Sequence, residues 1–187
     1  MQLRLPERYA KPAIVLHWVI ATLMALNLGI AWSFDLVAKS GSGSLKGMHK
    51  SIGILVLGLA ITRLLWRLTH TPPPIPPYAE WERRSARAMH WLLYALMFCI
   101  PLTGWANDSA WKGAATHPLR LFYVVPWFRF GWLEHLAPAT KEQWHTVLLQ
   151  LHISLAYVLC AAFVVHVAGA LKHQFLERKP ELQRMWF

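Results

Sequence analysis

The sequence predicts an all-α membrane protein with four membrane-spanning helices and both termini on the cytoplasmic side. Three observations predict this class: 56% of the 187 residues are hydrophobic, only 15% are charged, and several uncharged runs reach membrane length. Soluble domains average about 25% charged residues, and disordered chains are less hydrophobic. We therefore expect one membrane-embedded domain over residues 1–187.

Three helices follow from uncharged runs of about 20 residues, the length that crosses about 30 Å of hydrocarbon. They are expected at approximately residues 12–34, 88–107 and 143–171. The first run is longer than the apolar core of a signal peptide, and no small-residue cleavage motif follows it. We therefore expect the first helix to be retained.

The remaining helix is expected at approximately residues 45–68. Its uncharged centre is short, running only from Ser51 to Thr62 between Lys50 and Arg63. The segment spans the bilayer if these two cations reach the interface or meet a buried anion. The alternative is a re-entrant or interfacial segment.

The connections differ in composition. KSGSGS at residues 39–44 predicts a flexible tether, and HTPPPIPP at residues 70–77 predicts an extended polyproline segment. Residues 81–87 are expected to lie along the surface before the third helix. The aromatic-rich outer loop, residues 108–141, is interpreted as partly interfacial, with a short amphipathic helix over a site as the alternative.

The charge distribution sets the orientation. Four crossings place both termini on one side, where twelve of the 19 lysines and arginines fall, against seven on the other. This excess favours cytoplasmic termini. The net charge of +10 does not indicate a nucleic-acid partner, because the basic residues form no continuous stripe.

Ten histidines require an explanation, because ionisable groups in a bilayer are costly and mark functional candidates. His152 and His166 are 14 residues apart on the last helix, so they share a face at an axial separation of about 21 Å. One metal ion cannot bind both. The spacing therefore indicates two cofactors, one near each membrane face.

Depth supplies a second ligand for each cofactor. His17 lies six residues after Lys11 and His166 six before Lys172, so both sit about 9 Å inside the same boundary. His49 and His152 both fall toward the opposite side. The expected pairs are His17 with His166 and His49 with His152.

Two imidazoles satisfy a six-coordinate haem iron and leave no position for oxygen, which favours electron transfer. The sequence has no C-x-x-C-H motif, so we expect two non-covalent b haems. The two cysteines, Cys99 and Cys160, lie in apolar runs and predict no disulfide framework.

Neighbouring residues fit the same hypothesis. Gly53 and Gly169 share the faces of His49 and His166 and would admit a flat macrocycle; close helix packing explains them equally well. Arg63 and Lys50 could pair with haem propionates or simply reach the interface.

The other histidines leave alternatives open. His145 and His173 each lie seven residues from an expected ligand, so either could support a ligand, face solvent or replace it. His90 opens the third helix, where it could contact a propionate or a quinone, or cap the bundle. His70, His117 and His135 fall in loops and are expected to be solvated.

Sequence motifs occur in all four expected helices: PERY with LHW (residues 6–18), MHKSIG (48–53), TRLLWR (62–67), MHWLLYAL with PLTGW (89–105) and VVHVAGALKHQF (164–175). In this combination of motifs the chain resembles the bacterial dihaem cytochrome b561 family. The resemblance implies an inner-membrane four-helix bundle holding two b haems. It maps the ligands to His17, His49, His152 and His166.

Members of this family typically react with quinones. The resemblance implies electron transfer between a periplasmic donor, superoxide in some members, and the membrane pool of ubiquinone or a related quinone. The alternative is a haem-bearing anchor or relay subunit for a partner dehydrogenase or reductase. A further alternative is a haem-free helical bundle or transporter, whose visible spectrum would show no Soret band. The basic residues that could steer an anionic donor on the outer side are Lys39, Lys46, Lys50, Lys112, Arg120 and Arg129.

Overall fold

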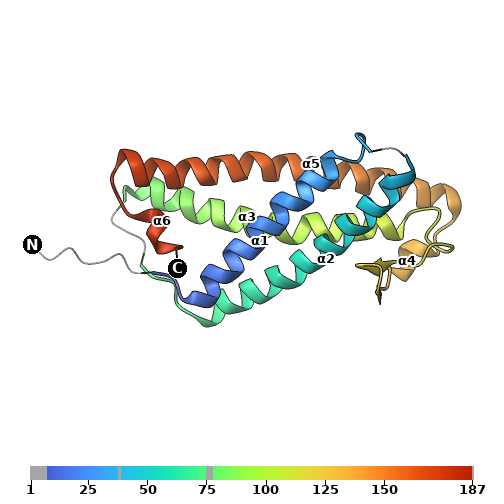
Figure 1. The fold of residues 1–187 in the computed structure, drawn as a ribbon, viewed down its shortest axis with the longest axis horizontal. Coiled ribbons are helices and arrows are strands. Elements are labelled where there is room, and N and C mark those ends of the chain that lie inside the picture. Colours follow the sequence, from blue (N-terminus) through green and yellow to red (C-terminus); the bar gives the residue numbers. More distant parts are fainter. Residues whose placement is uncertain (1–7, 38, 75–77, 187) are drawn as a thin grey trace, which may run out of the picture.

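Four long helices form the protein (Figure 1), seen in a computed structural model that describes residues 8–37, 39–74 and 78–186. They are α1 (Lys11–Trp32), α2 (Lys39–Thr69), α3 (Glu80–Ser109) and α5 (Pro138–Leu171). Each is long and apolar enough to cross a membrane. The predicted class of a helical protein with four membrane-spanning helices is confirmed. α2 runs for 31 continuous residues, as a spanning helix does and a re-entrant segment does not.

Three connections differ from the sequence predictions. The expected tether is wrong, because α2 begins at Lys39 and includes residues 39–44; a helix extends through glycine at a cost of only about 1 kcal/mol per residue. Residues 81–87 belong to the first turns of α3. The negative charges of Glu80 and Glu82 stabilise this end of the helix, where the helix dipole is positive. α5 begins at Pro138, five residues earlier than expected, because proline suits a first helical turn. Part of the expected polyproline segment, residues 75–77, lies outside the described residues.

The outer loop folds onto the end of the bundle that we call the outer end. It contains an antiparallel pair of two-residue strands, β1 (Arg120–Leu121) and β2 (Val125–Pro126), and one short helix, α4 (Gly131–Glu134). The amide of Phe122 donates to Ser51 Oγ of α2 at 2.7 Å. A helix of four residues is not the amphipathic cover that the sequence offered as an alternative.

The opposite end, which we call the inner end, is closed by the last residues of the chain. A π-helical turn, η1 (Lys172–Leu176), leads to α6 (Glu181–Arg184). Trp18 Nε1 of α1 donates to the Met185 carbonyl at 2.7 Å, and Arg184 donates to the Pro74 carbonyl at 2.8 Å. The first half of α1 and residues 184–185 therefore meet at one end of the bundle.

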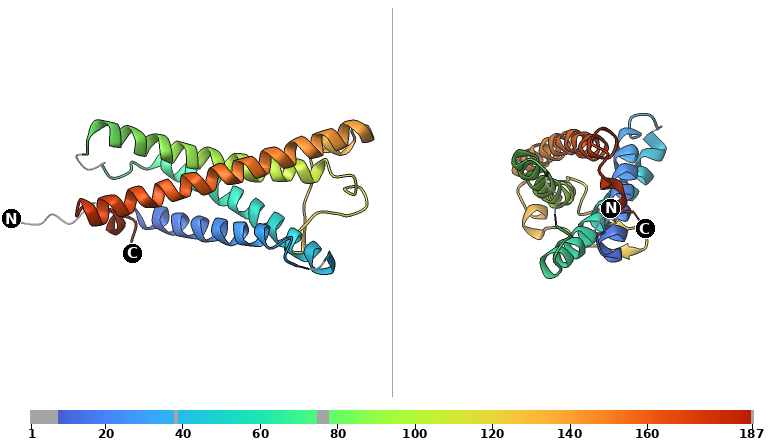
Figure 2. Two further views of the ribbon diagram at one scale, coloured as in Figure 1. Left: turned by 90° about the horizontal axis from the view of Figure 1, so that it is seen from above. Right: turned by 90° about the vertical axis from the view of Figure 1, so that its left-hand side faces the viewer.

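The helices pack in an order that leaves α5 apart from α1 and α2. α1 packs on α2, α2 on α3 and α3 on α5, whereas within the described residues α5 does not pack closely along α1 or α2. Figure 2 shows the long helices arranged around a common axis. Only 11% to 22% of the most apolar stretch of each helix is buried, as expected for helices that face lipid.

Candidate histidine sites between the helices

The outer pair of histidines joins α2 to α5. The rings of His49 and His152 lie 6.0 Å apart, centre to centre, and nearly perpendicular. His49 Nδ1 donates to the Asn27 carbonyl at 3.2 Å, and His152 Nδ1 donates to the Ile100 carbonyl at 2.9 Å. Both rings therefore keep Nε2 free, in the arrangement typical of metal-binding histidines.

The inner site contains three histidines rather than two. The rings of His17 and His166 lie 6.4 Å apart, and the ring of His90 from α3 lies 5.7 Å from that of His166. The sequence placed His90 at the inner end of the third helix without predicting this contact. Arg63 of α2 reaches toward this site, with its Nη1 3.5 Å from the Ala13 carbonyl, one turn before His17.

The ring separations fit the haem iron that the sequence indicates. Two imidazoles that share a metal ion have centres about 6 Å apart, because each metal–nitrogen bond is about 2 Å and each ring centre lies about 1 Å behind its nitrogen. The separations of 6.0 Å and 6.4 Å are close to this value, as is the 5.7 Å between His90 and His166 at the inner site. The helices that carry each pair also do not pack closely on one another, as a macrocycle between them requires.

One glycine that the sequence reasoning missed lies against an outer histidine. A Cβ added at Gly104 of α3 would stand 2.9 Å from Cε1 of His152. Gly104 follows Ile100 by one turn, so its missing side chain lets the ring reach the Ile100 carbonyl. Its place in the PLTGW motif was the available signal. By contrast, a Cβ at Gly53 would meet only Asn27 at 3.9 Å, and one at Gly169 would meet nothing within 4 Å, which leaves room beside both pairs.

A buried aspartate, Asp108, organises the outer end. Its carboxylate accepts from Lys50 Nζ at 2.5 Å and from Arg129 Nε at 2.8 Å, and only 4% of its side chain is exposed. Arg129 also donates to the Ala114 carbonyl. Lys50 therefore has a protein carboxylate as partner, so a haem propionate would have to compete for it.

His145 and His173 take part in other contacts. Asn107 Nδ2 donates to the His145 carbonyl at 2.8 Å, which ties α3 to α5 outside the outer pair. His173 stacks on Tyr78 with ring centres 4.3 Å apart, and its Nδ1 lies 3.0 Å from Glu177. The structure thus places both outside the two facing pairs.

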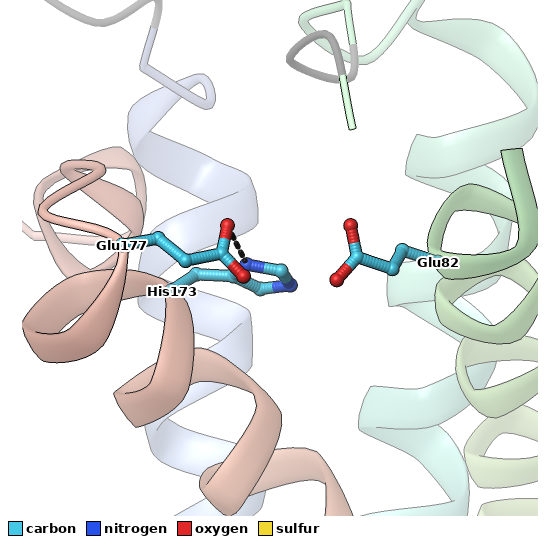
Figure 3. Close-up of side chains that lie close together, drawn as sticks. All are labelled: Glu82, His173 and Glu177. Carbon is cyan, nitrogen blue, oxygen red and sulfur yellow. Dashed lines mark hydrogen bonds and ion pairs between the residues drawn. The ribbon is translucent and has the colours of Figure 1, made fainter. Parts of the chain in front are cut away.

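Glu82, His173 and Glu177 converge at the inner end (Figure 3), with ligand atoms within 4.8 Å of one another. Lys172 Nζ bridges the two carboxylates at 2.6 Å and 3.0 Å, and Lys179 holds Glu177 at 2.6 Å. Hydrogen bonds from Lys179, Lys172 and His173 lower the pKa of Glu177 to about 2. The lysines already neutralise the carboxylates, so the cluster is an ion-pair network that fastens η1 to α3.

Facing histidines at two depths of a membrane-spanning bundle are typical of one class, the membrane-bound b-type cytochromes. Comparison with known proteins gives the family: the model of the prokaryotic cytochrome b561 family matches residues 8–187. The chain belongs to this family, a family of multi-pass bacterial membrane proteins that bind haem b and transfer electrons.

Individual relatives are similar over nearly their whole length. Cytochrome b561 homolog 2 of Escherichia coli K12 is 33% identical, with 96% of this chain and 92% of the relative aligned. A probable superoxide oxidase, CybB, of Yersinia pestis is 27% identical over 96% of both chains. Cytochrome b561 homolog 1 of E. coli K12 is also 27% identical, over 96% of this chain and 97% of the relative.

Proposed function

We propose that the protein carries electrons through two b haems across the bacterial inner membrane, from a periplasmic donor to a membrane quinone. One observation carries the proposal: each of two histidines on α5 faces a histidine from another helix at the separation that one iron requires. The proposed ligands are His17 and His166 at the inner end, and His49 and His152 at the outer end. Bound haem supplies reversible one-electron chemistry.

Ligand variants test the assignment through haem content. His17→Ala and His166→Ala should each remove the inner haem, and His49→Ala and His152→Ala the outer haem, leaving one haem per chain by pyridine haemochrome assay. His117→Ala is the matched control, because this exposed ring belongs to the outer loop. Retention of two haems by any of the four ligand variants contradicts the pairing.

The donor that we propose is a small anion, and superoxide is the leading candidate because one relative is named a probable superoxide oxidase. Two superoxide ions each lose one electron and become oxygen; the two electrons and two protons convert a quinone into a quinol. Lys46, Lys112 and Arg120 are exposed near the outer end and support steering of an anion. Lys50 and Arg129, in contrast, are engaged by Asp108.

Salt dependence tests the steering. The screening length falls from about 30 Å to about 8 Å between 0.01 M and 0.15 M salt. The second-order rate constant for reduction by an anionic donor should fall about tenfold over this range. Lys112→Gln together with Arg120→Gln should flatten the dependence. A flat profile for the unchanged protein contradicts steering.

We place the quinone, a ubiquinone or a close relative, at the inner end beside His90. The position of His90 on α3 supports this placement, because its ring lies 5.7 Å from the ring of the proposed ligand His166. His90→Ala should raise the KM for quinone several-fold while two haems remain. Loss of the inner haem in this variant would instead make His90 part of the haem site, and an unchanged KM would exclude it from the quinone site.

A further inference from the structure

We propose that the two centres differ in reduction potential, with the outer centre lower and the inner centre higher, and that Arg63 is the residue that raises the inner one. Electrons would then pass downhill from the outer to the inner end. The inference rests on the proposed function, since it takes the two histidine pairs as haem ligands.

The first difference lies in the hydrogen bonds behind the rings. Both outer histidines donate Nδ1–H to a backbone carbonyl, that of Asn27 at 3.2 Å and that of Ile100 at 2.9 Å. A donated N–H makes an imidazole a stronger ligand and stabilises the oxidised iron. Among the described residues, no hydrogen bond of this kind reaches His17 or His166, so the outer centre is the more easily oxidised.

The second difference is a cation at the inner end, Arg63, that has no carboxylate partner among the described residues. Arg63 reaches from α2 to the Ala13 carbonyl at 3.5 Å, one turn before His17, so its guanidinium carries a positive charge to the inner end. Within the described part of the chain, no carboxylate forms an ion pair with Arg63. A nearby positive charge favours the reduced iron, which carries one positive charge fewer. Arg63 therefore raises the potential of the inner centre.

The cation next to the outer pair is partly neutralised. Lys50 follows His49 in the chain, but its ammonium lies 2.5 Å from the carboxylate of Asp108, which also holds Arg129. The field of Lys50 at the outer pair is thereby reduced by an adjacent negative charge. Hydrogen bonding and charge act in the same direction, so neither effect offsets the other.

The experiment is a redox titration of the purified protein followed in the visible spectrum. His49→Ala and His17→Ala proteins, each with a single haem, assign the two steps of the intact protein. The inner haem, retained in His49→Ala, should have the higher midpoint. Arg63→Met should lower that midpoint, shifting the electron distribution between the haems about tenfold toward the outer one. Arg63→Lys should keep it near the original value.

Arg87→Met is the matched control, because Arg87 is exposed near the start of α3 and should shift neither midpoint. An inner midpoint below the outer one, or an Arg63→Met protein with two haems and unchanged midpoints, overturns the inference. If Arg63→Met does not assemble, the order of the midpoints in the two single-haem proteins decides alone. A preparation with fewer than two haems, or ligand variants that do not pair as proposed, overturns the proposed function and this inference with it.

Discussion

Replacing Gly104 with alanine should displace the outer haem without changing any ligand. The new Cβ would stand 2.9 Å from Cε1 of His152 and 3.2 Å from its Nδ1, where ordinary contact begins at 3.4 Å. The ring would have to move by about 0.5 Å, which exceeds the roughly 0.2 Å over which metal–ligand distances vary. The movement would also strain the 2.9 Å hydrogen bond to the Ile100 carbonyl.

Pyridine haemochrome analysis should therefore give close to one haem per chain for Gly104→Ala, and the remaining spectrum should match that of His152→Ala. Gly58→Ala is the control, because a Cβ at that position on α2 meets nothing within 4 Å; it should retain two haems. A Gly104→Ala protein with two haems and an unshifted spectrum would refute the proposed role of Gly104, because the ring would then have room that the structure does not show.

Three further changes probe the two ends of the bundle. Asp108→Asn removes the buried carboxylate that pairs with Lys50 and Arg129 and should lower the free energy of unfolding by about 3–5 kcal/mol. Glu80→Gln, which removes an exposed ion pair, should lower it by about 0.5 kcal/mol or less. Equal losses of the two variants in denaturant titrations would contradict the role of burial. Leu133→Ala truncates a fully buried side chain of α4 and should cost about 2–5 kcal/mol, seen as faster proteolysis of the outer loop; unchanged proteolysis would contradict it. The carboxylate of Glu177 stabilises the fold above its ordinary pKa of 4.5, and this contribution is lost as the pH falls toward about 2. The melting temperature of Glu177→Gln should thus lie below that of the unchanged protein at neutral pH and converge with it in acid; a difference independent of pH would contradict the titration.

The helices could be predicted because a bilayer imposes both a length and an absence of charge on each of them. The second helix, with its short uncharged centre, was predicted to span the bilayer if its flanking cations reach the interface or meet a buried anion. Lys50 meets that condition through Asp108, of which only 4% is exposed. The partner itself could not be identified, because no local pattern links Lys50 to a residue 58 positions away.

The same limit explains the errors. The Gly–Ser run at residues 39–44 favours a tether by composition, and only the attached apolar helix explains why it continues as helix. Among the histidines, depth along the helices predicted which rings face each other, since the rise per residue is fixed. Their role as haem ligands stays a prediction. Gly104 was missed because its effect depends on a ring from α5, which no spacing within α3 indicates.

The helix that contributes none of the proposed ligands contacts the two proposed ligands of α5. α3 packs along α5 and touches its histidines at both ends, through His90 against His166 and through the Ile100 carbonyl against His152. α1 and α2, which supply the opposing ligands, do not pack closely along α5 within the described residues. α3 therefore contacts both α5 rings, and the hydrogen bond to the Ile100 carbonyl sets the direction of the His152 ring. It follows that substitutions on the α5-facing side of α3 should alter the spectra and potentials of haems to which α3 supplies no ligand.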